Sequence, residues 1–162
     1  ALERGQRGER FPLLVVADGH VDVAVPRRVH ADGREELVGA AAPDDALADA
    51  LEGLAARSPV PVSVRVAGDA VGSAETEAAL FYVCSEALTN AVKHAHARRV
   101  SITVRRLDGA IVASVADDGR GGADPSGSGL QGLADRLAAR KGQLRVESPP
   151  GAGTTVVATI PD

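Results

Sequence analysis

The chain has few aromatic side chains and a single cysteine. Its 162 residues include two Phe and one Tyr, with neither Trp nor Met, although 44% of the residues are hydrophobic. The core must therefore be built from aliphatic side chains. Cys84 has no partner for a disulfide within the chain, which fits a reducing compartment, and we interpret it as a small buried hydrophobe.

Long apolar runs and an excess of positive charge are also missing. No segment approaches the length of about 20 apolar residues that spans a bilayer, and no secretory signal is visible. The formal net charge is −4 and no basic stripe appears, which argues against a nucleic-acid-binding protein. We expect a cytoplasmic domain, and the sequence leaves open whether a longer parent protein is anchored in a membrane.

Apolar periodicity predicts helices and strands in mixed order. The expected helices are 44–57, 73–96 and 130–140. The expected strands are 60–67, 100–106, 110–116, 143–148 and 154–160. This order predicts an α+β fold, a two-layer sandwich with helices on one face of a mixed, mainly antiparallel sheet.

The first 43 residues do not continue this pattern. Residues 13–17 and 21–25 are short β-prone runs, and Asp18-Gly19-His20 between them predicts a hairpin turn. Residues 26–39 are polar and hard to assign. We therefore divide the chain into an extension or linker, 1–43, and one domain, 44–162.

The long helix predicted at 73–96 carries a polar face. At about 100° per residue, four polar residues fall on one side: Glu86, Asn90, Lys93 and His94. The opposite side is apolar, with Leu80, Phe81, Cys84, Leu88, Ala91, Val92 and Ala95. Polar groups beside a core are costly unless they meet a ligand. Amide and carboxylate oxygens suit Mg²⁺, and a lysine suits phosphate.

Three glycine-rich segments follow this helix. Residues 117–122 end a strand, so that the Asp117 carboxylate can accept a hydrogen bond from an exocyclic amine while Gly119 and Gly121 let a flat ring approach. Residues 127–133 open a helix whose N–H groups suit an anion, but no Gly-Lys-Ser/Thr follows, as a P-loop requires. Residues 151–155 predict a hairpin turn. Each segment alone also fits a solvated turn.

The four elements in this order resemble the ATP-binding domain that sensor histidine kinases share with gyrase-type topoisomerases, Hsp90 chaperones and MutL proteins. Glu86-xxx-Asn90-xx-Lys93-His94 resembles the N box of this GHKL, or Bergerat-fold, family. Asp117-x-Gly119-x-Gly121 resembles its G1 box. The other matches are Gly127-x-Gly129-Leu130 with Gly132-Leu133, similar to the G2 box, and Gly151-x-Gly153-Thr154. The chain looks most similar to actinobacterial kinases of the nitrate/nitrite-sensor type.

The resemblance implies ATP and Mg²⁺ as ligands and gives each motif a role. Asn90 would ligate Mg²⁺, and Glu86 would orient the metal shell, through water, or polarise the attacking group. Lys93 and His94 would contact phosphates or ribose, and Asp117 would take the adenine amine. Gly119 and Gly121 would let the ring approach, and Thr155 would bond the adenine site through its hydroxyl or a water. Gly127, Gly129 and Leu130 would border the phosphate cradle and a short lid (122–127) that is mobile without nucleotide.

A histidine kinase also needs a phosphoacceptor histidine on a dimerising helical hairpin. His30 is the nearest candidate, but no room remains before Pro43 for two long helices, so we interpret it as a loop histidine. The expected partners are a dimerisation domain of the same kinase and a response regulator. The fragment would be monomeric, and the full kinase homodimeric.

Other readings of the same motifs remain open. A serine kinase of the anti-sigma-factor type shares the fold, although Lys93-His94 and the 129–133 run favour a histidine kinase. A gyrase-type clamp would need a longer chain. A module that binds nucleotide without transferring phosphate is disfavoured by the intact Asn90 and Asp117.

Overall fold

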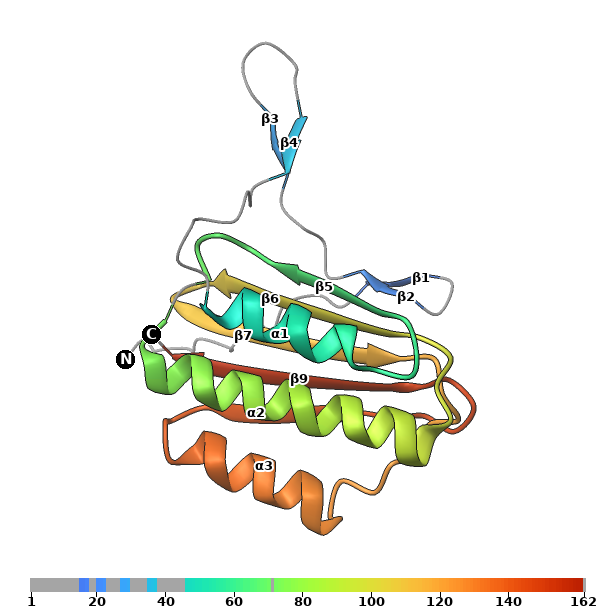
Figure 1. Ribbon diagram of the computed structural model, residues 1–162. Coiled ribbons are helices and arrows are strands. Elements are labelled where there is room, and N and C mark those ends of the chain that lie inside the picture. The colour runs from blue at the N-terminus through green and yellow to red at the C-terminus, as the bar shows by residue number, and fades with distance from the viewer. Residues whose placement is uncertain are drawn as a thin grey trace, which may run out of the picture.

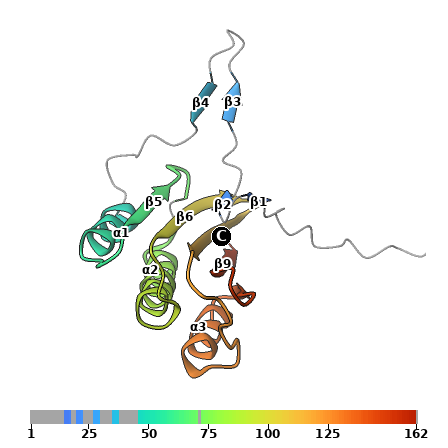
Figure 2. The same ribbon diagram turned by 90° about the vertical axis from the view of Figure 1, so that its right-hand side faces the viewer.

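A computed structural model describes residues 15–17, 20–22, 27–29, 35–37, 46–70 and 72–161. Its main body is a five-stranded sheet with three helices on one face (Figure 1; Figure 2). The predicted two-layer architecture is therefore confirmed.

The strands are ordered β5-β6-β7-β9-β8 across the sheet. β5 (Val62–Val66) runs parallel to β6 (Val100–Leu107). The other neighbours are antiparallel: β7 (Ala110–Asp117), β9 (Thr154–Pro161) and β8 (Gln143–Glu147). β6 and β7 form a hairpin, as predicted, and its turn residues Asp108 and Gly109 have φ values of 50° and 77°. Positive φ at both positions is what a tight two-residue hairpin needs.

Three helices cover the sheet: α1 (Ala46–Ala56), α2 (Ala74–Asn90) and α3 (Ser128–Ala138). α2 starts where its sequence signals predict, because the Ser73 side chain accepts a hydrogen bond from the Thr76 amide. Two acids in the first turn, Glu75 and Glu77, complement the helix dipole. α2 lies between the other two helices in Figure 1.

The core between the layers is aliphatic. Its fully buried side chains include Leu80, Ile102, Leu133 and Ile160, each at most 2% exposed. Cys84 is also completely buried, and this burial raises the pKa of its thiol to about 12. The thiol therefore stays protonated and packs as a small hydrophobe, as the sequence predicts.

The helix predicted over 73–96 is two helical segments in the structure. α2 ends at Asn90, and a π-helical turn, η1 (Ala91–Ala95), continues it. His96 then ends the helix in the left-handed conformation, with φ of 53°. Periodicity placed the end of the helix correctly but did not reveal the wider turn. Single π-helical turns often occur at functional sites.

The N-terminal region contains two separate hairpins. β1 (Val15–Ala17) pairs antiparallel with β2 (His20–Asp22), which confirms the predicted hairpin but makes His20 part of a strand rather than of the turn. β3 (Arg27–Val29) pairs with β4 (Glu35–Leu37) within the segment that we left unassigned. Among the strands described, these four form no ladder with the five-stranded sheet.

Several predictions fall beyond the part of the chain that the structure covers. His30 and residues 43–45, the expected start of the first helix, lie outside the described residues. The division of the chain at residue 43 stays a prediction. Within the helices that the structure describes, none is long and apolar enough to cross a bilayer.

Candidate nucleotide site

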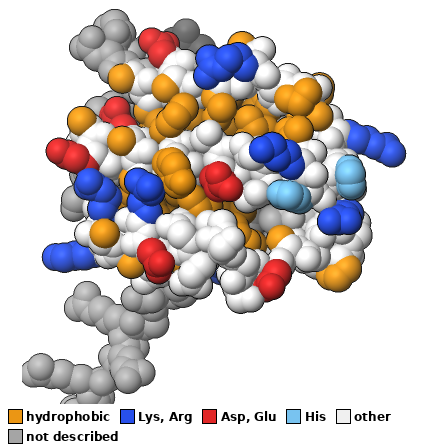
Figure 3. Space-filling model, turned by 60° about the horizontal axis from the view of Figure 1, so that its bottom comes forward, with side chains coloured by type: hydrophobic (Ala, Val, Ile, Leu, Met, Phe, Trp, Pro, Cys, Tyr) orange, Lys and Arg blue, Asp and Glu red, His pale blue; other side chains and the backbone are white. Residues whose placement is uncertain are grey.

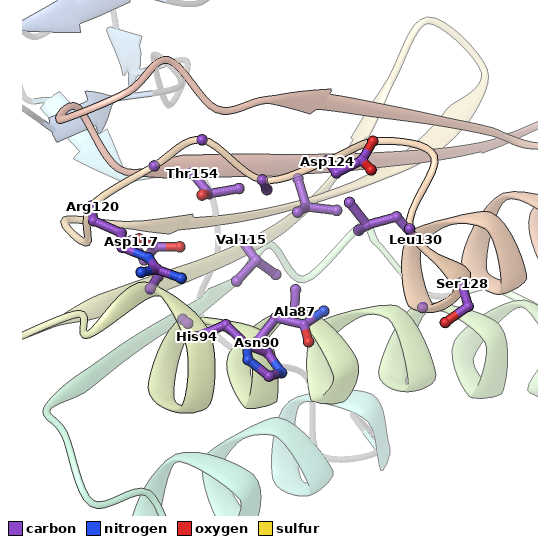
Figure 4. Close-up of a pocket in the computed structure, with 18 residues that line it drawn as sticks. Ala87, Asn90, His94, Val115, Asp117, Arg120, Asp124, Ser128, Leu130 and Thr154 are labelled. Atoms are coloured by element: carbon purple, nitrogen blue, oxygen red, sulfur yellow. The ribbon is translucent and has the colours of Figure 1, made fainter.

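A cavity of about 420 Å³ opens between α2 with η1, the adjoining ends of β7 and β9, and the loop that leads into α3 (Figure 4). Seven residues that the sequence analysis named line it: Asn90, His94, Asp117, Gly121, Gly127, Gly129 and Leu130. Segments far apart in sequence thus meet in one cavity, as the resemblance implies. The volume lies within the range of about 300–1,000 Å³ that is usual for small-molecule sites.

The walls of the cavity are apolar. Val115 and Val156 come from the sheet, Ala87 and Ala91 from the helix, and Leu130 from the start of α3. Opposed aliphatic surfaces of this kind can contact both faces of a planar ring. The cavity therefore suits a heteroaromatic ligand at the end where Asp117 lies.

Asp117 is the last residue of β7, and its register partner is Thr154, the first residue of β9. Its carboxylate oxygen Oδ1 accepts a hydrogen bond from the Gly119 amide at 2.7 Å. Burial raises the pKa of Asp117, and the amides of Gly119 and Thr154 only partly oppose this effect. The site thus holds a half-buried carboxylate that gains from a ligand donor.

The loop after Asp117 packs against the end of η1 and is hydrogen-bonded to it. A Cβ at Gly119 would lie 2.5 Å from the Ala95 carbonyl oxygen and 2.6 Å from the Ala95 Cβ. The next amide, of Arg120, donates to that same carbonyl at 2.8 Å. Gly119 therefore does not line the cavity, and its small size serves the contact between the loop and η1.

Asp118 also holds this loop, through hydrogen bonds to Arg98 and Arg99. Its Oδ1 accepts from the Arg98 and Arg99 amides at 2.8 and 3.0 Å, and its Oδ2 pairs with Arg99 Nε at 3.1 Å. Burial acts to raise the pKa of Asp118, but the two amides and the Arg99 guanidinium outweigh it and lower that pKa. The structure therefore explains both acids of the Asp117-Asp118 pair, one in the cavity and one as an anchor.

The polar helix face divides into two groups. Asn90 and His94 line the cavity, whereas Glu86 and Lys93 do not. Glu86 still lies beside the start of α3, because a Cβ at Gly129 would be 3.5 Å from Glu86 Oε1. Lys93 is exposed. Only half of the predicted polar set therefore borders the cavity directly.

Basic and histidine side chains gather at the end of η1. The exposed residues there are Lys93, His94, His96, Arg98 and Arg99. In Figure 3 the His side chains on the visible face lie among Lys and Arg side chains, to the right of an apolar region. In a chain with a net charge of −4, this basic end favours an anionic ligand.

Gly121 and the lid, residues 122–127, close the cavity opposite the helix. Gly121 has φ of 63°, and a side chain on it would overlap the Pro149 carbonyl, so only glycine fits there. Asp124 holds a tight turn by accepting from the Ser126 hydroxyl at 2.7 Å and the Ser126 amide at 2.9 Å, and these bonds lower the pKa of Asp124. Mobility of this lid stays a prediction.

The two threonines at the start of β9 differ in position. Thr154 lines the cavity, whereas Thr155, the residue named from the sequence, is buried and is not among the lining residues. Alternation along a strand explains the difference, because adjacent side chains point to opposite faces of the sheet.

Sequence reasoning gave no role in the site to Arg120 and Ser128, placed Gly122, Ala123 and Asp124 only in the lid, and named Thr154 only as part of a glycine motif, although all six line the cavity. The register of β9 against β7 would have identified Thr154, since Asp117 and Thr154 are direct partners. The others lie in the loop between β7 and α3 or at the first residue of α3, where no periodicity indicates which residues face inward.

Comparison with known proteins agrees with this geometry. The profile of the family described as histidine kinase-, DNA gyrase B-, and HSP90-like ATPase matches residues 75–162. This chain belongs to that family.

Two curated relatives are histidine kinases by name. The chain is 36% identical over 89 residues to the signal transduction histidine-protein kinase/phosphatase DegS of Brevibacillus brevis, covering 52% of this chain and 23% of DegS. It is 36% identical over 80 residues to UhpB of Salmonella typhimurium, covering 48% and 16%. The chain thus matches less than a quarter of the length of these relatives.

Solved structures show the same fold. The histidine kinase domain of the blue-light activated kinase EL346 from Erythrobacter litoralis superposes with a TM-score of 0.53 at 25% identity, covering 70% of this chain and 57% of that chain. A second structure of EL346 gives 0.57 at 26% identity, covering 71% and 39%. The mycobacterial sensor kinase MprB gives 0.51 at 21% identity, covering 71% and 91%.

Proposed function

We propose that this chain is the ATP-binding catalytic domain of a sensor histidine kinase. It transfers the γ-phosphoryl group of ATP to a histidine on a separate dimerisation domain, from which a response regulator receives it. The observation that carries the proposal is the half-buried Asp117 carboxylate at one end of an apolar-walled cavity, with Asn90 on its helix wall.

The Asp117 end of the cavity favours adenine over guanine. A carboxylate only accepts hydrogen bonds, so it pairs with the exocyclic amine of adenine and repels the carbonyl that guanine has at the corresponding position. Val115, Val156 and Leu130 contact the ring faces. Because Asp117 is half-buried and its pKa is raised, a ligand donor stabilises its ionised form.

The other end of the cavity suits phosphates with Mg²⁺. Among the described residues no group of three or more His, Cys, Asp or Glu could hold a metal ion. A site with one amide oxygen, from Asn90, fits Mg²⁺ all the same, because this ion is commonly held by one or two protein ligands together with substrate phosphates. When bound, Mg²⁺ neutralises charge on the transferring phosphoryl group.

The chain's own groups position the phosphates. Gly127 is the N-cap of α3 and no side chain caps the first turn, so the N–H groups there are available to an anion. Lys93 is exposed and adds positive charge, and the exposed His94 lines the cavity with Asn90. Glu86, next to Gly129, is suited to orient the metal shell or to polarise the attacking histidine. Phosphoryl transfer needs mainly such positioning and charge neutralisation.

The parent protein would be a homodimeric kinase whose catalytic domain lies in the cytoplasm, where ATP is available. Similarity to DegS and UhpB over about half of this chain supports a kinase of this kind. Within the family, the chain would belong to the nitrate/nitrite-sensor-like subgroup, and Lys93-His94 favours a histidine kinase over a serine kinase of the anti-sigma-factor type. No residue of this chain is proposed as the phosphate acceptor.

A phosphotransfer assay in trans tests the proposal. The purified chain is mixed with the phosphoacceptor hairpin encoded by the same reading frame, together with γ-labelled ATP and Mg²⁺. We expect acid-labile label on the hairpin and none on this chain. Label on serine of a separate substrate, or acid-labile label on His30, would contradict it.

A further inference from the structure

Ser148 follows β8 and contacts both the lid and the cavity wall. Its carbonyl oxygen accepts from the Gly122 amide at 2.9 Å, and its hydroxyl accepts from the Ala123 amide at 2.9 Å. The same hydroxyl lies 2.8 Å from the hydroxyl oxygen of Thr154, which lines the cavity. Ser148 does not itself line the cavity.

We propose that Ser148 is a positioning residue that holds the start of the lid and directs the Thr154 hydroxyl toward the nucleobase. The inference rests on the proposed ATP site and goes beyond it, because it assigns a role to a residue outside the cavity. It concerns residues 122–123, the first two of the lid, and not the tight turn that Asp124 and Ser126 make.

The available donors and acceptors favour Ser148 as the donor in its hydrogen bond with Thr154. The Ser148 oxygen already accepts from the Ala123 N–H, so its own hydrogen is available to the Thr154 oxygen. When Ser148 donates, the hydroxyl hydrogen of Thr154 is free to point into the cavity. A ring nitrogen of adenine is an acceptor for it. In this series of hydrogen bonds the Ala123 amide donates to Ser148, Ser148 donates to Thr154, and Thr154 donates to the base. Every donor then has an acceptor.

Hydrogen bonds in a chain strengthen one another. A base that accepts from Thr154 therefore favours the Ser148 donor orientation, and with it the Ala123 contact. Occupation of the adenine end and attachment of the lid start are coupled through Ser148, which is half-buried and thus partly shielded from competing water.

Ser148→Ala tests the role with two readouts. It removes the hydroxyl but keeps the carbonyl that accepts from Gly122. Without nucleotide, amide hydrogen exchange at Ala123, measured by NMR, is expected to become about fivefold faster, as loss of one hydrogen bond predicts. The affinity for ATP is expected to fall about three- to tenfold. Ser148→Thr, which keeps a hydroxyl, should restore both.

Thr154→Val supplies the coupling test, because it removes the hydroxyl at nearly constant shape. If Ser148 acts through Thr154, adding Ser148→Ala to Thr154→Val causes no further loss of ATP affinity. Ser101→Ala, at a half-buried serine of β6 that does not line the cavity, is the matched control and should leave both readouts unchanged. Melting temperatures verify that each variant is folded.

Two results would overturn the proposal: unchanged exchange at Ala123 in Ser148→Ala, or affinity losses of Ser148→Ala and Thr154→Val that multiply. A wild-type chain that bound no ATP would instead refute the proposed function and the coupling to nucleotide. Exchange at Ala123 in the free protein would still decide whether Ser148 holds the lid.

Discussion

The carbonyl oxygen of Ala95 accepts a hydrogen bond from the backbone amide of Arg120 at 2.8 Å. This contact joins the end of η1 to the loop that follows β7. In a regular α-helix the last four carbonyl groups have no hydrogen-bond partner within the helix. Here one of them is used to hold the loop that carries Asp117. The helix wall and the Asp117 end of the cavity are thereby fixed relative to each other.

Gly119→Ala should separate these two parts of the cavity. The added Cβ would lie 2.5 Å from the Ala95 carbonyl, a backbone atom that cannot rotate away. We expect a loss of about 1–3 kcal/mol in the free energy of unfolding, together with weaker ATP binding. Gly132→Ala is the control, because nothing lies within 4 Å of its Cβ position on α3. It should stabilise the protein by about 0.5–1 kcal/mol. Equal urea midpoints for the two variants would contradict this account.

Asp117→Asn should abolish adenine recognition without weakening the fold. Burial raises the folded-state pKa of Asp117 above its ordinary value of 3.8. The stability contribution of this group therefore falls as the pH rises from 3.8 through the folded pKa, and its full cost is present at neutral pH. The neutral amide removes that cost and still accepts from Gly119. We expect an equal or higher melting temperature at pH 7, with at least tenfold weaker ATP binding by calorimetry. Normal ATP binding would refute the adenine role.

Asn90→Ala should remove the part of nucleotide affinity that depends on Mg²⁺. Binding of ATP is measured by calorimetry with Mg²⁺ and with excess EDTA. The wild type should bind more tightly with Mg²⁺, and the variant should bind with nearly equal affinity in both. Thr89→Ala is the neighbouring control, since its hydroxyl donates to the Ser85 carbonyl within the helix. Unchanged magnesium dependence in Asn90→Ala would count against the metal role.

Asp118→Ala should weaken the fold in a pH-dependent way. The exposed pair with Arg99 contributes at most about 1 kcal/mol, so the two amides that Asp118 accepts from carry most of the effect. We expect a loss of about 1–3 kcal/mol at pH 7. Because the folded pKa is lowered, this contribution is present above pH 3.8 and is lost as the pH falls through the folded pKa. Urea unfolding of the wild type and Asp118→Ala, at pH 7 and below the folded pKa, measures this contribution. A stability difference between the two proteins that is the same at both pH values would be inconsistent with the anchoring role.

Much of the fold follows from local patterns in the sequence. Alternating valines predicted β5, and the Ser73 cap with its early acids predicted the start of α2. The order of strands across the sheet could not be read in this way, because it depends on pairing between distant segments. β9 lies between β7 and β8, an arrangement that no periodicity encodes.

The site was predictable where a motif determines both residue and position, as for Asn90 and Asp117. It was not predictable where side chains of adjacent residues diverge. Thr154 and Thr155 are chemically identical, and only the register against Asp117 shows which of them borders the cavity. Lys93 lies one residue before His94, yet only His94 reaches the lining, because adjacent residues of a helix point about 100° apart.

The most direct test of the account is the melting temperature of this chain as a function of nucleotide concentration with Mg²⁺. If the cavity binds adenine nucleotides, the melting temperature rises with ATP or ADP by mass action. GTP at the same concentrations produces little shift, and Asp117→Asn needs at least tenfold more ATP for the same shift. A melting temperature that stays constant up to millimolar ATP, or one that rises equally with GTP, would contradict the adenine site on which the proposed kinase function depends.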